Sequence, residues 1–310
     1  NLMSYKEIEE RLKNNGIIIL DGGIGGELQK LGAPMDKGLW AGKCTIDNPE
    51  LVKKVHASYI SSGADVITAN TYATPPISMR EHGYSEFINE WNTKGVKLAK
   101  SVAESSEQNI SVAGSVSTYG SWDRLSEDEL IPGFKEQIKI LSDAGADFLI
   151  LEAMSSALNT VETLVKCSLD TNLPVWLSIS CALDKKTDKL MLGYQESIEK
   201  NTKSYLYNNF EKSIQSIETI HKGPILIAHT DLTIINRALY ELKRNFSGII
   251  GAYPNVGYFE KPTWNFMEKE ITSNQYLDEA KSWIKSGAQI LGGCCGVGPS
   301  RIKAISKLKN

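Results

Sequence analysis

Short runs of β-branched and apolar residues alternate along the chain with longer segments in which apolar residues recur at helical spacing. This alternation is typical of a parallel sheet whose strands are joined by helices. The runs predict eight strands, at residues 16–21, 65–70, 111–116, 147–152, 174–181, 224–229, 248–253 and 288–293. Eight strand–helix units in 310 residues indicate an α/β protein with a (β/α)₈ TIM barrel, because an open doubly wound sheet more often stops at about five or six strands.

Three of the predicted helices end in a Gly-Ala pair directly before a strand, at Gly63, Gly145 and Gly287. Glycine there suits a helix C-cap. No linker divides the chain, so we expect residues 1–310 to form a single domain, with residues 1–3 interpreted as the remnant of an expression tag. Two segments rich in polar residues, 184–209 and 255–274, are predicted to be long loops at the mouth where the strands end.

The balance of 34 basic and 37 acidic residues, without long runs of either sign, argues against a nucleic-acid or membrane surface and favours small-molecule ligands. The first residues lack the features of a signal peptide, and no apolar run approaches the roughly 20 residues that span a bilayer. Five cysteines do not form a disulfide framework. We therefore expect a cytoplasmic protein, as a monomer or a small homo-oligomer.

Near the C-terminus, Cys294 and Cys295 stand side by side among glycines at the end of an apolar run. Neighbouring side chains on a regular strand point to opposite faces, so both thiols can reach one metal ion only where glycines let the backbone bend. Thiolates are good zinc ligands, and a catalytic zinc usually keeps three protein ligands and one open position. The pair therefore predicts a zinc site with a third ligand elsewhere in the chain.

Barrel enzymes build their sites from the C-terminal ends of several strands. The predicted strands present there Asp21, Asn70, Ser115, Glu152, Ser180, His229, Tyr253 with Asn255, and the two cysteines. In such a barrel His229 converges with Cys294, although the two are 65 positions apart (294 minus 229). Asp21 and Glu152 suit either structural salt bridges or a substrate ammonium group.

These residues and their surroundings, in this order, resemble the homocysteine S-methyltransferase family, zinc enzymes built on a (β/α)₈ barrel. The segments that carry the resemblance are 20–28, 39–40, 48–52 with His56 and Tyr59, 63–72, 113–116 with 119–120, 145–147 with Glu152, 174–180, 253–255 and 287–296. The resemblance implies zinc-dependent transfer of a methyl group from a sulfonium or quaternary ammonium donor to the thiol of homocysteine, giving methionine. S-methylmethionine and S-adenosylmethionine are favoured as donors, since the chain looks more like the short branch of the family than the betaine-using branch.

The resemblance also implies roles for residues of this chain. Cys294 and Cys295 would be zinc ligands, and the metal-bound substrate thiol would need no further catalytic side chain. The expected substrate contacts are Asp21, Glu27, Trp40, Asn70, Tyr119, Glu152, Ser180 and Asn255. Aromatic faces attract cations, so Trp40, Tyr72 and Tyr119 either hold the cationic donor or simply pack over the mouth.

The chain departs from the family at the metal itself. The family's third ligand is a cysteine in an Asn-Cys-Thr sequence, where this chain has Ala228-His229-Thr230. We expect His229 to complete a His-Cys-Cys zinc site. Gly26 stands where the family has threonine, and Ser117-Thr118 where it has Gly-Pro, which together suggest an altered pocket.

Two alternatives stay open: a barrel that binds a small amino acid or sulfonium compound without methyl transfer, and a zinc hydrolase using Glu152 or Asp21 as general base.

Overall fold

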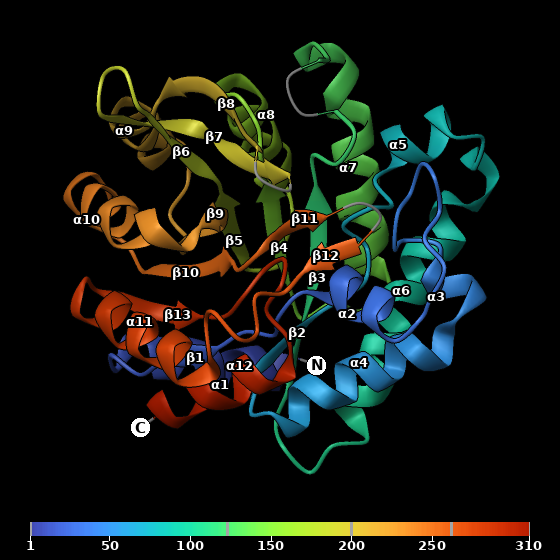
Figure 1. Ribbon diagram of the computed structural model, residues 1–310. Helices are drawn as coiled ribbons and strands as arrows, with labels where there is room; N and C mark the ends of the chain where they lie inside the picture. Colours follow the sequence, from blue (N-terminus) through green and yellow to red (C-terminus); the bar gives the residue numbers. More distant parts are fainter. Residues whose placement is uncertain (1, 122–123, 199–200, 261–262, 310) are drawn as a thin grey trace.

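The computed structural model describes residues 2–121, 124–198, 201–260 and 263–309 (Figure 1). The eight predicted strands are all present, as one parallel sheet with the order β1-β13-β10-β9-β5-β4-β3-β2. A bridge between Leu20 and Val66 joins the two edges, so the barrel prediction is confirmed. The barrel strands are β1 (Ile18–Ile19), β2 (Val66–Thr68), β3 (Ser111–Ser117), β4 (Phe148–Ala153), β5 (Val175–Ile179), β9 (Ile225–Asp231), β10 (Ile250–Asn255) and β13 (Ala288–Leu291).

Helices surround these strands (Figure 1). Gly63, Gly145 and Gly287 have φ of +99°, +98° and +100°, which confirms the predicted glycine at the ends of three helices. The α-helices of the described residues are α1 (Leu2–Lys13), α2 (Ile24–Lys30), α3 (Cys44–Asp47), α4 (Pro49–Ser61), α5 (Pro76–Glu81), α6 (Ile88–Glu104), α7 (Glu127–Asp143), α8 (Leu158–Ser168), α9 (Phe210–Ile220), α10 (Ile235–Asn245), α11 (Ser273–Lys285) and α12 (Pro299–Ile305). Short 3₁₀ turns occupy Ser85–Phe87, Leu232–Ile234 and Ser306–Leu308.

Helix α1 closes the N-terminal mouth of the barrel. Its Tyr5 packs against Phe148 at 5.0 Å between ring centroids, and Phe148 in turn packs against Trp176 at 4.5 Å. The indole N–H of Trp176 donates a 3.0 Å hydrogen bond to the Tyr5 hydroxyl. These rings fill the barrel interior at this end, which leaves the opposite mouth, with its polar strand ends, for a site.

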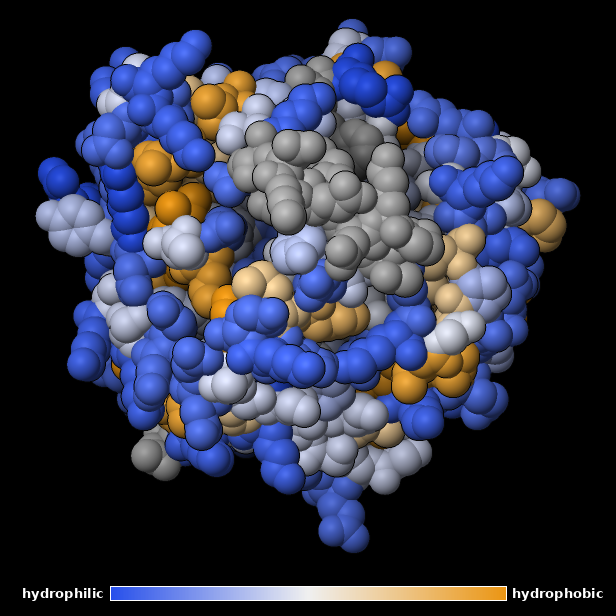
Figure 2. Space-filling view, viewed as in Figure 1, coloured by the Kyte–Doolittle hydropathy of each residue, from blue (hydrophilic) through white to orange (hydrophobic). Residues whose placement is uncertain are grey.

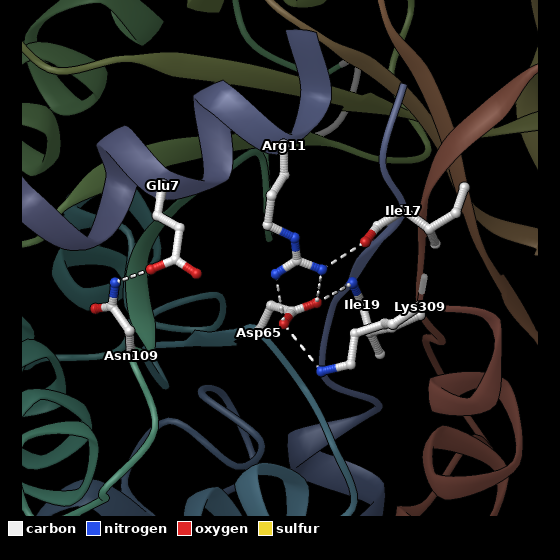
Figure 3. Close-up of polar contacts among 7 residues, drawn as sticks. All are labelled: Glu7, Arg11, Ile17, Ile19, Asp65, Asn109 and Lys309. Carbon is white, nitrogen blue, oxygen red and sulfur yellow. Dashed lines mark hydrogen bonds and ion pairs between the residues drawn. The ribbon is translucent and has the colours of Figure 1, made fainter. Parts of the chain in front are cut away.

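A charged cluster ties both ends of the chain to this closed mouth (Figure 3). The Asp65 carboxylate accepts hydrogen bonds from Arg11 of α1 at 2.9 and 3.3 Å, and one at 2.8 Å from the backbone N–H of Ile19 in β1. Lys309, near the C-terminus, approaches the same carboxylate at 2.9 Å. One side chain therefore fixes α1, β1 and the C-terminal residues relative to β2.

The prediction of two long loops is wrong. The first segment holds β7 (Lys189–Ile198) and β8 (Asn201–Asn209), preceded by β6 (Cys181–Asp184), and the second holds β11 (Tyr258–Glu260) and β12 (Thr263–Asn265). They form a second sheet, in the order β12-β11-β7-β6 with β8 paired to β7. Figure 1 shows β6, β7 and β8 beside α9 on the flank of the barrel. Cross-strand packing outweighs the polar composition here, as in the stacked pair Tyr194 and Tyr205.

The predicted strand 174–181 also differs from the structure, because it divides after Ile179 into β5 and β6. The described helices include none with the length and apolar character needed to cross a membrane. On the face shown in Figure 2, hydrophobic residues form scattered groups among hydrophilic ones.

Candidate active site

A cavity of about 270 Å³ opens at the C-terminal mouth of the barrel. Its polar lining comes from the ends of five barrel strands, β1, β2, β4, β9 and β10, and from the loop after β13, as the barrel prediction required. The residues it brings together include Asp21, Asn70, Glu152, His229, Tyr253, Cys294 and Cys295. A second cavity, of about 250 Å³, adjoins it and shares Trp40, Tyr194, His229 and Cys295 with the first.

His229, Cys294 and Cys295 form a compact cluster of potential metal ligands. Nδ1 of His229 lies 3.9 Å from each of the two sulfur atoms, and all three ligand atoms fall within 4.8 Å of one another. His229 has a φ of +47°, so β9 leaves regular strand geometry at this residue. The convergence predicted from the sequence is thus present in the structure.

Glycines around the thiol pair act mainly through close packing. Gly296 does have a positive φ, of +79°, and a Cβ there would lie 1.7 Å from the carbonyl oxygen of Val256. Gly293 has ordinary φ, yet a Cβ there would lie 2.1 Å from the Val297 side chain. The turn that brings both thiols to one side therefore needs glycine at these two positions for different reasons.

The cluster fits a zinc ion. Zn–S bonds of about 2.3 Å and a Zn–N bond of about 2.0 Å in a tetrahedral site separate the ligand atoms by about 3.5–3.8 Å. The sulfur–nitrogen separation in such a site is about 3.5 Å, and the observed sulfur–nitrogen distances of 3.9 Å are about 0.4 Å longer. Two thiolates and an imidazole are also a donor set that zinc accepts, and the cluster borders the main cavity, where a fourth ligand could enter.

The pKa values of the two thiols shift in opposite directions. The hydrogen bond to Cys295 and burial raise the pKa of Cys294 well above the usual thiol range, whereas the hydrogen bond from Cys294 lowers the pKa of Cys295. Without a cation, the pair therefore holds one negative charge more readily than two.

Two buried carboxylates face the same cavity. Asp21 accepts hydrogen bonds from the Thr68 backbone N–H at 2.7 Å and from the Thr68 hydroxyl at 3.1 Å, yet burial raises its pKa to about 8. Burial also raises the pKa of Glu152, opposed by a 3.3 Å hydrogen bond from the Tyr253 hydroxyl. Among the described residues neither carboxylate forms an ion pair with Lys or Arg, so the salt-bridge alternative has no support and a cationic ligand would be their partner.

Aromatic rings surround the cavity. Trp40, Tyr72 and Tyr119, the three rings singled out from the sequence, all line it, and Tyr72 meets Tyr119 edge-on at 5.6 Å. Sequence reasoning missed Tyr194, which comes from β7 and lies 5.2 Å from the His229 ring. The alternation of Leu190, Leu192 and Tyr194 was the available signal for a strand with one buried face.

Four of the predicted substrate contacts either bond other protein groups or lie outside the lining of the main cavity. Asn70 lines the main cavity, but its amide donates to the Ala41 carbonyl and the Thr45 hydroxyl at 3.0 and 3.1 Å. The buried Ser180 hydroxyl accepts a 2.7 Å bond from the Ser155 backbone. The remaining two lie outside the lining of the main cavity: Glu27 lines a third cavity of about 440 Å³, and Asn255 lines the second cavity.

Comparison with known proteins gives a consistent result. Residues 18–308 match the sequence model of the family described as homocysteine S-methyltransferase. Homocysteine S-methyltransferase 3 of Zea mays is 27% identical over 95% of this chain and 90% of its own length, and YbgG of Bacillus subtilis, named a homocysteine S-methyltransferase, is 27% identical over 96% of both. A selenocysteine methyltransferase of Astragalus bisulcatus is 26% identical over 94% and 91%.

Among solved structures, the metallated form of the homocysteine methyltransferase MmuM from Escherichia coli superimposes with a TM-score of 0.75 at 22% identity. The match covers 96% of this chain and 97% of that one. At this identity the likeness confirms the fold.

Proposed function

Because the chain belongs to the homocysteine S-methyltransferase family, we propose that it transfers a methyl group from a sulfonium or quaternary ammonium donor to the thiol of homocysteine, giving methionine. In this transfer the donor's bond to its methyl carbon breaks, a new sulfur–carbon bond forms, and the thiol proton is released. One observation carries the proposal: a single cavity holds both the His229–Cys294–Cys295 cluster and the buried carboxylates Asp21 and Glu152.

We propose zinc as the metal, held by His229, Cys294 and Cys295. A thiol with its usual pKa near 8.5 is mostly protonated at neutral pH, and zinc, when bound, supplies the Lewis acidity that makes a thiolate available there. The side chains of the cavity then have two tasks, which are to orient the acceptor and to hold a cationic donor away from water.

Asp21 and Glu152 suit the ammonium group of the acceptor. Both are buried, and burial raises their pKa values. A bound ammonium group would favour the ionised carboxylates and gain charge-assisted hydrogen bonds. The carboxylates would thus fix the amino-acid end of homocysteine and direct its sulfur toward the cysteine pair.

The aromatic rings suit the donor. A sulfonium or quaternary ammonium centre gains about 0.5–2 kcal/mol from each well-placed ring face, and Trp40, Tyr72, Tyr119 and Tyr194 line the cavity. We propose a sulfonium donor, S-methylmethionine or S-adenosylmethionine, ahead of a betaine. The chain matches two homocysteine S-methyltransferases over 90% and 96% of their own lengths, as expected for the short branch of the family rather than the betaine-using branch.

The test is methionine formation from homocysteine with S-methylmethionine, S-adenosylmethionine or betaine, together with zinc per chain on protein purified without chelator. We expect near-stoichiometric zinc in the wild type, a fall in both His229→Ala and Cys294→Ser, and methionine from a sulfonium donor. Selenohomocysteine belongs in the acceptor panel, since one relative is named for a selenium acceptor. Homocysteine binding without transfer from any donor would instead support the binding-only alternative, and amide or ester hydrolysis the hydrolase.

His229→Cys tests the altered ligand directly. Replacing imidazole by thiolate makes the protein's contribution to the site one unit more negative, which weakens the metal as a Lewis acid but leaves a more reactive thiolate. Gain of zinc affinity and of methyl transfer would indicate that histidine is a tolerated substitute. Loss of both would show that the site requires imidazole.

A further inference from the structure

The second cavity, of about 250 Å³, differs in chemistry from the main one, which alone contains Asp21 and Glu152. Among the described residues, its lining includes no Asp, Glu, Lys or Arg side chain. Three aromatic rings and three side-chain amides line it instead: Trp40, Tyr194, Trp264, Gln29, Gln195 and Asn255. Such a cavity suits an uncharged, flat ligand whose edges form hydrogen bonds.

Contacts within the protein hold the three rings in place. The Trp264 indole N–H donates a 2.8 Å hydrogen bond to a backbone carbonyl, and Tyr205 stacks on Tyr194 at 4.9 Å between ring centroids. The Trp40 ring packs so closely on Gly25 that a Cβ added there would lie 2.2 Å from it. Rings that are already fixed lose little conformational freedom when a flat ligand stacks on them.

The two cavities meet beside Gly26 of α2. They share these lining residues: Gly26, Trp40, Tyr194, His229 and Cys295. Gly26 differs from its neighbour Gly25, because a Cβ added at Gly26 would meet only the Phe266 ring, at 3.8 Å, among the described residues. The absence of a side chain at Gly26 therefore leaves space where one cavity continues into the other.

The two candidate sulfonium donors differ in one substituent. S-methylmethionine carries two methyl groups on its sulfur, whereas S-adenosylmethionine carries one methyl group and an adenosyl group. The adenosyl group is uncharged, its base has flat faces, and its base edges and ribose hydroxyls need neutral hydrogen-bond partners. The charged amino-acid end, which both donors share, would lose its hydration in the second cavity without gaining an opposite charge.

We propose that the second cavity is a nucleoside subsite, which receives the adenosyl group of S-adenosylmethionine while the sulfonium lies between the cavities, beside Trp40 and Tyr194. The methyl group can then reach the acceptor sulfur near His229 and Cys295, which border both cavities. Transfer breaks the donor's sulfur–methyl bond, forms the new sulfur–carbon bond of methionine and leaves S-adenosylhomocysteine as a neutral thioether. The thiol proton goes to solvent. The inference rests on the proposed function for this reaction.

The subsite is tested without methyl transfer by calorimetric titration of the purified protein with 5′-methylthioadenosine, a nucleoside thioether without the amino-acid end. We expect one molecule bound per chain. Trp264→Leu should weaken binding about 5- to 150-fold, because a stacking surface for the base is lost. Gln195→Ala should weaken it about 2- to 12-fold through a lost hydrogen bond. Gln108→Ala, at an exposed amide before β3, is the matched control and should bind like the wild type.

Three results would overturn the subsite. The wild type could fail to bind 5′-methylthioadenosine, or both Gln195→Ala and Trp264→Leu could bind it as the wild type does. Weaker binding in Tyr119→Leu but not in Gln195→Ala would place the nucleoside in the main cavity, which Tyr119 lines and Gln195 does not. Gln195 is only half-buried, so its variant decides the matter even if Trp264→Leu does not fold.

The choice of donor is tested with Gly26→Val, which places a branched side chain where the cavities meet. Relative to S-methylmethionine, kcat/KM for S-adenosylmethionine should fall about 5- to 150-fold, the usual effect of overfilling a packed site. An unchanged ratio would contradict the path past Gly26.

The two proposals fail in different ways. Methionine formed from S-methylmethionine alone, by a protein that binds no 5′-methylthioadenosine, would keep the reaction and overturn the nucleoside subsite. Nucleoside binding that depends on Gln195, without methionine from any donor, would support the subsite and overturn the reaction.

Discussion

At the residue scale, the site depends on polar groups that are buried before any ligand arrives. Asp21 is 5% exposed, Glu152 is 7% exposed, and their partners are the neutral groups of Thr68 and Tyr253. A carboxylate in such a place is costly to ionise. The same property makes it responsive to a cationic ligand, so stability and binding are linked at these positions.

Asp21→Asn should change how stability depends on pH. The pKa of Asp21 rises from 3.8 to about 8 on folding, so the folded state binds the proton more tightly; the resulting stabilisation is complete below pH 4 and is lost as pH rises to 8. The loss is at most about 6 kcal/mol. Asparagine cannot ionise; its Oδ1 can accept from the Thr68 N–H while its Nδ2 donates to the Thr68 hydroxyl oxygen. The stability of the variant relative to the wild type should therefore increase as pH rises from 5 to 8.

Urea unfolding of metal-free protein at pH 5, 7 and 8 measures this difference. Asp278→Asn, on an aspartate whose side chain is 72% exposed, is the control and should follow the wild type at every pH. A gap between Asp21→Asn and wild type that is the same at pH 5 and pH 8 would contradict the prediction.

Tyr194→Leu should weaken binding of the cationic donor more than binding of homocysteine. Leucine keeps an apolar contact but removes the ring face, worth about 0.5–2 kcal/mol, so the KM for a sulfonium donor should rise about 2- to 30-fold. The KM for homocysteine should change little. Steady-state kinetics with each substrate varied separately measure both values, with Tyr240→Leu, on a tyrosine 60% exposed, as control. An equal rise in both KM values would argue against a donor-specific role.

At the element scale, the second sheet completes the mouth of the barrel. Strand β7 brings Tyr194 to the cavity, and β12 brings Trp264 to the second cavity. Stacking of Tyr194 on Tyr205, at 4.9 Å and 6° between planes, fixes the register of β7 and β8 at this point. The position of Tyr194 at the cavity therefore depends on the pairing of two strands outside the barrel.

Gly193→Ala should displace Tyr194 from the cavity. A Cβ at Gly193 would lie 1.9 Å from the Tyr205 carbonyl oxygen, so β7 and β8 cannot keep their pairing beside Tyr194. We expect lower thermal stability and a higher donor KM, in the direction of Tyr194→Leu. Gly83→Ala is the matched control, since Gly83 also has a positive φ, of +80°, but open space around it. Equal effects of the two variants would show that backbone strain, and not displacement of Tyr194, causes the changes in stability and KM.

At the scale of the whole molecule, the closed mouth opposite the site holds the barrel together. Asp65 joins residues of α1 and β1 to Lys309, which lies 244 positions after Asp65 along the chain (309 minus 65). Such a contact forms only when the barrel closes. It is far from the cavity in the fold, so stability and chemistry can be perturbed separately.

Asp65→Ala should destabilise the protein by about 2–4 kcal/mol, because it leaves the Ile19 N–H and two cations without their acceptor. The side chains of Arg11 and Lys309 are 30% and 28% exposed, so water moderates the loss. Chemical unfolding measures it, and Asp278→Ala, at an exposed pair, should cost less than about 0.5 kcal/mol. Unchanged stability in Asp65→Ala would show that the cluster contributes nothing to barrel closure.

The sequence by itself determined the barrel, its eight strands and the three side chains of the candidate metal cluster. Apolar runs of strand length between helical segments dictate parallel strands, and the C-terminal ends of parallel strands meet at one mouth, so His229 and the two cysteines had to converge. The cysteine pair already indicated a zinc ion, and the resemblance to a known family added the expected reaction at that mouth, methyl transfer to homocysteine.

Only the tertiary structure decided what depends on contacts between distant segments. The polar composition of residues 184–209 conceals strands whose pairing comes from side chains across the sheet, so Tyr194 could not be placed in advance. Predicted contacts at Asn70 and Ser180 are engaged with neighbouring loops, and Asn255 with the metal cluster. Which helices and strands form depends on the local sequence, because the periodicity of apolar residues is a property of each short segment. The partner of each polar group depends on which surfaces the closed barrel brings together.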